Sequence, residues 1–131
     1  MSSSPLLQRI MPASTSPFLW RSGAILAAVG MIAGAFGAHA LKRRPGITAD
    51  NLYAWGTASN YAIMNGVGLM LVSMHPRFSV HRFAGPAIAT GGAVFSGSVM
   101  ALVLFKDFKF LGPVTPLGGM LMIAGYVSLA L

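Results

Sequence analysis

Few side chains in this 131-residue chain could carry out chemistry. The only carboxylates are Asp50 and Asp107, and the histidines are His39, His75 and His81. His75 and His81 are six residues apart, and neither stands at a metal-ligand spacing from His39, so no metal site is expected. The chain has no cysteine, no HExxH motif and no Gly-rich phosphate loop after a strand. These absences predict a non-enzymatic protein without a cofactor.

Asn65 is the most informative polar residue, because it lies near the middle of an apolar segment, where an unpaired amide costs free energy. Residues spaced three or four apart share its helical face, namely Thr57, Tyr61 and Gly68. This face is expected to point into the protein. One interpretation is an interhelical hydrogen bond from Asn65 to Ser96 or Ser98, and the other is a small polar site for a solute or a lipid headgroup.

The composition defines the medium around these residues. Hydrophobic types make up 55% of the chain and charged types 8%, against about 25% charged residues in ordinary soluble domains. The net charge is +7, and the basic residues fall between apolar blocks instead of gathering in one patch. Cations in such positions contact lipid headgroups, so a lipid bilayer is expected as the partner and nucleic acid is not.

Four apolar segments are each close to the roughly 20 residues that a membrane-spanning helix needs. The segments are residues 22–41, 53–74, 83–104 and 113–131. Their short connections favour antiparallel neighbours, which predicts an all-α transmembrane antiparallel four-helix bundle with both termini on one side. In the last segment Thr115 and Pro116 are typical of an N-cap and a first helical position, so the regular helix is expected to begin at Pro116.

The ends of the segments carry the signals for orientation and targeting. His39, Lys42, Arg43 and Arg44 follow one another at the end of the first segment and are expected at headgroup depth. The loop cations divide four against five between the two sides, which leaves the orientation open. Residues 1–21 are rich in Ser, Pro and Arg and lack acids, which is typical either of a mitochondrial presequence or of a flexible tail.

Small residues at helical spacing predict where the helices meet. Helices in lipid associate where small side chains let their backbones approach closely. The first segment carries a stripe of such residues, and the third and fourth segments carry further glycines. The predicted packing positions are Gly23, Ala27, Gly30, Gly34, Gly37, Gly92, Gly97, Gly118 and Gly119. The alternative is a substrate path lined by glycine.

Four motifs give the chain a family resemblance. GAFGAHAL at 34–41 resembles the GAFGAH(A/G)L signature of a family of small four-span membrane proteins of unknown function, which includes the bacterial YgdD-like proteins and eukaryotic transmembrane protein 256. TASNY at 57–61, FSGS at 95–98 and TPLGG at 115–119 resemble its further motifs in the same order. The family usually has a histidine where this chain has Asn65, which cannot titrate. The resemblance implies the four-helix membrane fold and no established activity.

These observations predict a multi-pass integral membrane protein that acts as a structural or assembly component, through helix–helix contacts with itself or with a membrane complex. The alternative is a small-solute or lipid transporter with a polar site around Tyr61, Asn65 and Ser96. Eukaryotic relatives suggest mitochondrial or endoplasmic-reticulum membranes, and the tail favours the mitochondrial one.

Overall fold

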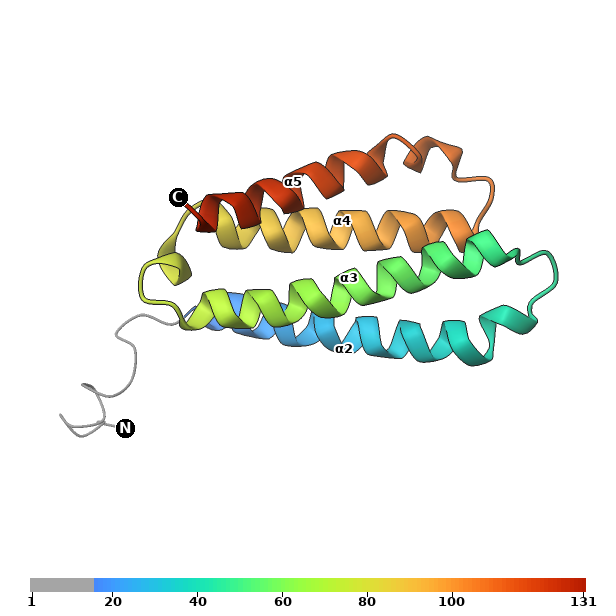
Figure 1. The fold of residues 1–131 in the computed structure, drawn as a ribbon, viewed down its shortest axis with the longest axis horizontal. Coiled ribbons are helices and arrows are strands. Elements are labelled where there is room, and N and C mark those ends of the chain that lie inside the picture. The colour runs from blue at the N-terminus through green and yellow to red at the C-terminus, as the bar shows by residue number, and fades with distance from the viewer. Residues whose placement is uncertain (1–15) are drawn as a thin grey trace.

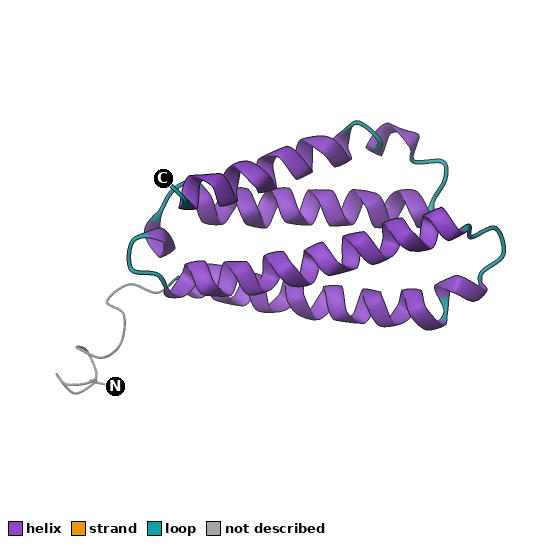
Figure 2. Cartoon of the chain, in the orientation of Figure 1, coloured by secondary structure: helices purple, strands orange, loops and turns teal. Residues whose placement is uncertain are grey.

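The computed structural model describes residues 16–131, which form four long helices joined by short loops. The helices are α2 (Pro17–His39), α3 (Ala49–Met74), α4 (Ala84–Leu104) and α5 (Val114–Leu129). Each loop contains a single 3₁₀ turn, namely η1 (Leu41–Arg43), η2 (Phe78–Val80) and η3 (Lys109–Leu111). Residues 16–131 contain no strand (Figure 2), which confirms the all-α prediction.

The helices form an antiparallel bundle in which each runs opposite to the next along the chain (Figure 1). Ser16, where the described chain begins, and the C-terminus lie at the same end, as expected; we call it the terminal end. It also holds the loop between α3 and α4, whereas the other two loops form the opposite end.

Helix α2 begins five residues before the predicted boundary at Ser22. The backbone N–H of Leu19 donates to the Ser16 hydroxyl at 3.3 Å, and Pro17 occupies the first helical position. A capping serine followed by proline is a strong start signal, because it satisfies one free N–H and fixes φ at the next residue. Residues 16–21, expected in the tail, therefore belong to the cap and first turn of α2; residues 1–15 lie outside the described residues.

The starts of α3 and α5 also differ from the predictions. Thr48 and Asn51 form a reciprocal capping box with two hydrogen bonds of 3.1 Å, so α3 begins at Ala49 and not at residue 53. Helix α5 begins at Val114, and Thr115 is not its N-cap. The Thr115 hydroxyl instead donates to the Leu111 carbonyl at 3.3 Å, within the turn that leads into the helix.

The bundle is built from two helical hairpins. Helices α2 and α3 pack closely along their length, as do α4 and α5, and the contact between α3 and α4 joins the two pairs. Two apolar clusters lie inside, one near the terminal end around Leu69 and Ile88 and one near the opposite end around Leu41 and Trp55.

Three stretches of the described chain are long and apolar enough to cross a membrane: Pro17–Arg43, Ala84–Leu104 and Lys109–Leu129. Helix α3 is long enough but more polar, since it carries Ser59, Asn65 and Ser73 on its buried face. Helices α2 and α4 run in the same direction (Figure 1). A chain that crosses a bilayer in the same direction through both of them must cross back between them through α3. Helix α3 is therefore the fourth span.

Candidate functional site

Helices α2 and α3 approach each other closely at the predicted stripe of small residues. A Cβ added to Gly23 would lie 2.5 Å from the Gly66 carbonyl oxygen, and one added to Gly30 would lie 2.9 Å from the Ser59 oxygen. At Gly37 the same atom would meet the Trp55 indole at 2.5 Å. Only glycine fits at these three positions.

Two further residues of the stripe, Ala27 and Gly34, differ in how closely they contact α3. Ala27 is buried, and its backbone nitrogen would lie 2.5 Å from a Cβ on Gly66. Gly34 is only half-buried, and an added Cβ would meet nothing closer than the Ser59 Cβ at 3.8 Å. Gly34 therefore lies at the edge of the contact and is not required by it, contrary to the prediction.

The predicted packing glycines of α4 and α5 also fall into two groups, those in close contact with another helix and those without such a contact. A Cβ on Gly118 would lie 2.7 Å from the Phe95 backbone nitrogen, and one on Gly92 would lie 2.7 Å from the Asn65 Nδ2 atom. Gly119 has only ordinary contact distances, from 3.5 Å. Gly97 is exposed and has nothing within 4 Å, so it is not a packing position; it lies on the outer face of α4.

Sequence reasoning missed the partners that these glycines face. Gly66 on α3 opposes Gly23, and Gly91 on α4 opposes Gly118. Gly66 and Gly91 are small residues of the kind that signals helix packing. They could have been predicted as packing positions only if the neighbouring helix had been known.

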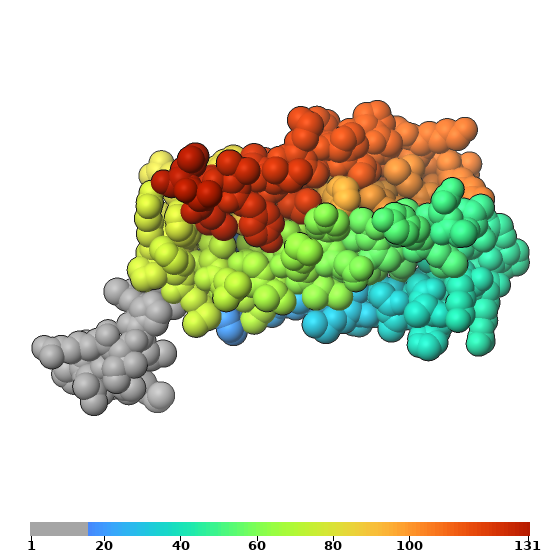
Figure 3. Space-filling view, viewed as in Figure 1, coloured from blue at the N-terminus to red at the C-terminus, as the bar shows by residue number. Residues whose placement is uncertain are grey.

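Asn65 is fully buried and binds α5, not the serines of α4 that were predicted. Its Oδ1 accepts a hydrogen bond from the Tyr126 hydroxyl at 2.9 Å, and its Nδ2 donates to the Met122 sulfur at 2.8 Å. Figure 3 shows α3 and α5 side by side on the viewed face. The amide thus has partners on both of its ends and joins the two hairpins.

The predicted serines make separate contacts. Ser96 is buried and donates to the Ala58 carbonyl at 2.8 Å, which connects α4 to α3. Ser98 shares a 2.6 Å hydrogen bond with Thr115 and so connects α4 to α5. Both serines are used to bind neighbouring helices.

Tyr61 does not join Asn65 inside the bundle. Its side chain is 37% exposed and packs edge-to-face on Phe95, with the ring centroids 5.5 Å apart. The buried stripe of α3 runs through Ala58, Ala62, Asn65 and Leu69. Tyr61, one turn before Asn65, is exposed and lies outside this stripe. Tyr61, Asn65 and Ser96 therefore do not form one polar site.

The histidines and cations lie at the ends of the bundle. His39, Lys42, Arg43 and Arg44 are exposed. The His81 Nδ1 atom accepts hydrogen bonds from the backbone N–H groups of Phe83 and Ala84, at 3.2 and 3.0 Å, at the start of α4. His75 binds the backbone of the same loop in the same manner.

The described residues offer little to a metal or a substrate. Within residues 16–131 no group of three or more His, Asp or Glu could hold a metal ion. In the same range every buried side-chain nitrogen or oxygen has a hydrogen-bond partner. The polar groups inside the bundle are thus used either by a neighbouring helix or by the backbone of their own helix.

Apolar helices with internally satisfied polar groups define a multi-pass helical membrane protein. The chain belongs to the family described as "Protein of unknown function (DUF423)", whose model matches residues 33–119. This finding confirms the resemblance to a small membrane-protein family without an established activity.

The relatives that the chain matches are named as membrane proteins. The chain is 32% identical over 115 residues to the UPF0382 membrane protein C1782.12c of Schizosaccharomyces pombe, covering 85% of this chain and 97% of the relative. It is 37% identical over 109 residues to a UPF0382 membrane protein of Staphylococcus aureus, covering 82% and 87%. No solved structure matches the chain significantly.

Proposed function

We propose that this protein is a non-enzymatic structural or assembly component of its membrane, which binds a second copy or other subunits through helix–helix contacts. One observation carries the proposal: a depression between α2 and α3 near the opposite end, with a volume of about 420 Å³. It is lined by Gly34, Gly37, Ala38, Lys42, Leu52, Trp55 and Gly56.

Two small residues that line this depression, Gly34 and Gly56, make no close contact with another helix of the chain. An added Cβ on Gly34 has only one neighbour, at 3.8 Å, and one on Gly56 has none within 4 Å. Small residues on the outside of a membrane helix let the backbone of another helix approach, which is how membrane helices associate. Gly34 and Ala38, four residues apart, form such a small-xxx-small pair on α2.

The test uses Gly34→Leu and Gly56→Leu in the full-length protein. We expect both variants to keep the wild-type thermal stability in detergent, because both positions have room. We also expect a lower yield of crosslinked oligomer, or of partners in a native purification, because leucine fills the depression. Gly97→Leu on α4 is the matched control and should change neither. Wild-type protein that purifies as a monomer without partners would contradict the proposal.

The alternative function, transport of a small solute or lipid through a polar site, has weaker support. Asn65 is a buried polar residue, but its amide is occupied by Tyr126 and Met122, and Tyr61 and Ser96 lie in other contacts. Flux into liposomes that contain the wild-type protein, and its loss in Asn65→Leu, would favour transport. Equal flux with and without protein for every solute class would exclude the transport function.

We further propose a mitochondrial membrane as the location, with the endoplasmic reticulum as the alternative. The support is the Ser- and Arg-rich, acid-poor composition of residues 1–21. Imaging of a C-terminally tagged chain with and without this segment tests the proposal. Mitochondrial signal that depends on the segment supports it, and reticular signal from both chains contradicts it.

A further inference from the structure

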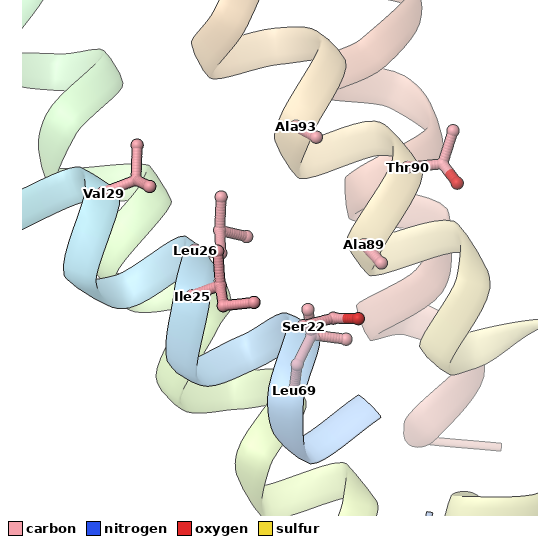
Figure 4. A pocket seen from close by; sticks show the side chains of 8 residues that line it. All are labelled: Ser22, Ile25, Leu26, Val29, Leu69, Ala89, Thr90 and Ala93. Atoms are coloured by element: carbon pink, nitrogen blue, oxygen red, sulfur yellow. The ribbon is translucent and has the colours of Figure 1, made fainter. Parts of the chain in front are cut away.

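A groove separates α2 from α4 on the side where neither is covered by a third helix. The two helices touch near the terminal end, where a Cβ added to Gly85 would lie 2.6 Å from the Leu19 side chain. Beyond that point they separate, and a groove of about 460 Å³ opens between them (Figure 4). Its walls are Ile25 and Val29 on one side and Ala89 and Ala93 on the other.

Two serine and threonine hydroxyl groups in this groove have no hydrogen-bond partner among residues 16–131. Ser22 and Thr90 line the groove, and neither side chain makes a hydrogen bond within residues 16–131. The other serines and threonines of that range, Ser79 apart, bind backbone groups or one another. Because an unpaired hydroxyl in an apolar medium costs free energy, these two are suited to a ligand that supplies acceptor oxygens.

Unneutralised positive charge lies at the same end as these hydroxyls. Arg21 precedes Ser22 on α2, and Arg82 stands two residues before α4 begins. The only two acidic side chains of the chain, Asp50 in the first turn of α3 and Asp107 in the loop after α4, lie at the opposite end. Arginine recognises phosphate with several parallel N–H donors, so Arg21 and Arg82 make this end of the bundle complementary to an anionic headgroup.

The depths of these groups along the bundle agree with the dimensions of a phospholipid. Thr90 lies six residues into α4, or about 9 Å from its start at 1.5 Å per residue. Arg82, before the start of α4, therefore lies at headgroup level, and the two hydroxyls lie deeper at the level of the ester oxygens. Arg21 directly precedes Ser22, and its long side chain can extend from there to the headgroup. The apolar walls continue towards the bilayer centre. The order is charge, then hydrogen-bond donors, then hydrocarbon.

We propose that this groove binds one anionic phospholipid. One acyl chain lies between α2 and α4 against Ile25, Val29 and Ala93. Its ester oxygens accept hydrogen bonds from Ser22 and Thr90, and its phosphate pairs with Arg21 and Arg82. A helix of a second copy could fill the apolar part of the groove, but it would bring no anion to the arginines, so the charge distribution favours the lipid.

Lipid titration of the purified full-length protein, followed by native mass spectrometry, tests this site. The probes are phosphatidylglycerol and phosphatidylcholine with identical acyl chains. We expect tighter binding of phosphatidylglycerol, at one molecule per chain. A basic residue near a membrane surface contributes about 1 kcal/mol towards an anionic lipid, so Arg21→Gln and Arg82→Gln should each weaken that binding about fivefold. Neither substitution should change the binding of phosphatidylcholine.

A second pair of variants tests the groove itself. Ala93→Phe fills the groove and should remove the bound lipid, whereas Ala124→Phe, at an exposed alanine of α5, is the matched control and should not. Equal binding of the two lipids by the wild type, or undiminished binding by Ala93→Phe, would overturn the proposal. Loss of a dimer in Ala93→Phe without loss of lipid would assign the groove to a second copy and would also overturn it. The same spectra report the oligomeric state, so a failure of the proposed assembly function is seen separately.

Discussion

The phenol of Tyr126 on α5 donates a hydrogen bond of 2.9 Å to the amide oxygen of Asn65 on α3, and this bond crosses from one helical hairpin to the other. The second Asn65 contact, to the Met122 sulfur, also reaches α5. Helices α3 and α5 share few other contacts. This buried amide therefore adds a polar link between the hairpins to the packing of α3 on α4.

Removing this amide should loosen the join between the hairpins. Asn65→Leu keeps the branched shape of the side chain but leaves the Tyr126 hydroxyl unpaired, and we expect a loss of about 1 kcal/mol, as is typical of interhelical hydrogen bonds in membranes. Tyr126→Phe should cost a similar amount. If the two groups act through each other, the double variant should be hardly less stable than either single one. Additive losses in detergent unfolding would show that they do not.

The close approach of α2 and α3 should make Gly30 intolerant of any side chain. A Cβ there would lie 2.8 Å from the Ile63 side chain and 2.9 Å from the Ser59 carbonyl oxygen. Gly30→Leu must therefore separate the two helices, and we expect a loss of about 2–3 kcal/mol, within the usual range for overpacking. The readout is the yield of folded protein and its melting temperature. Gly97→Leu, which meets nothing, should leave both unchanged.

The capping box at the start of α3 should contribute measurably to stability. Thr48→Ala removes the acceptor of the Asn51 backbone N–H and should cost about 1 kcal/mol, the usual value for a lost N-cap. Thr48→Ser retains the hydroxyl and should therefore keep most of the stability that Thr48→Ala loses. Amide hydrogen exchange in the first turn of α3 should become faster in the alanine variant only. Unchanged exchange there would mean that other contacts hold the turn.

The two tryptophans should report different environments. Trp55 is 5% exposed and donates from Nε1 to the Ala33 carbonyl oxygen at 2.7 Å, whereas Trp20 is 44% exposed. In a Trp20→Phe variant, the remaining emission should be poorly quenched by acrylamide. Trp55→Phe should lower stability by about 1 kcal/mol, the net value of one hydrogen bond. Strong quenching of Trp55 would show that the end of the α2–α3 contact opens.

The helices and their order were predictable because apolar length is a local property of the sequence. The boundaries of α4 differ from the prediction by one residue. The stripe on α2 was predictable from its spacing, yet spacing could not show that Gly34 lies at the edge of the contact while Gly37, three residues later, lies within it. The partners of Asn65 could not be predicted, because the sequence does not specify which neighbouring helix faces an inward amide. Ser96 and Tyr126 were both chemically able to bind it, and the rotation of α3 selects Tyr126.

The short last helix affects the lipids that surround the protein. The 16 residues of α5 form a cylinder about 24 Å long, shorter than a hydrocarbon layer of about 30 Å. The 23 residues of α2 extend about 35 Å. Bilayer thickness follows the length of the helix beside it, so acyl chains next to α5 must shorten or tilt while those beside α2 remain extended. The protein therefore imposes a thickness gradient on the surrounding bilayer.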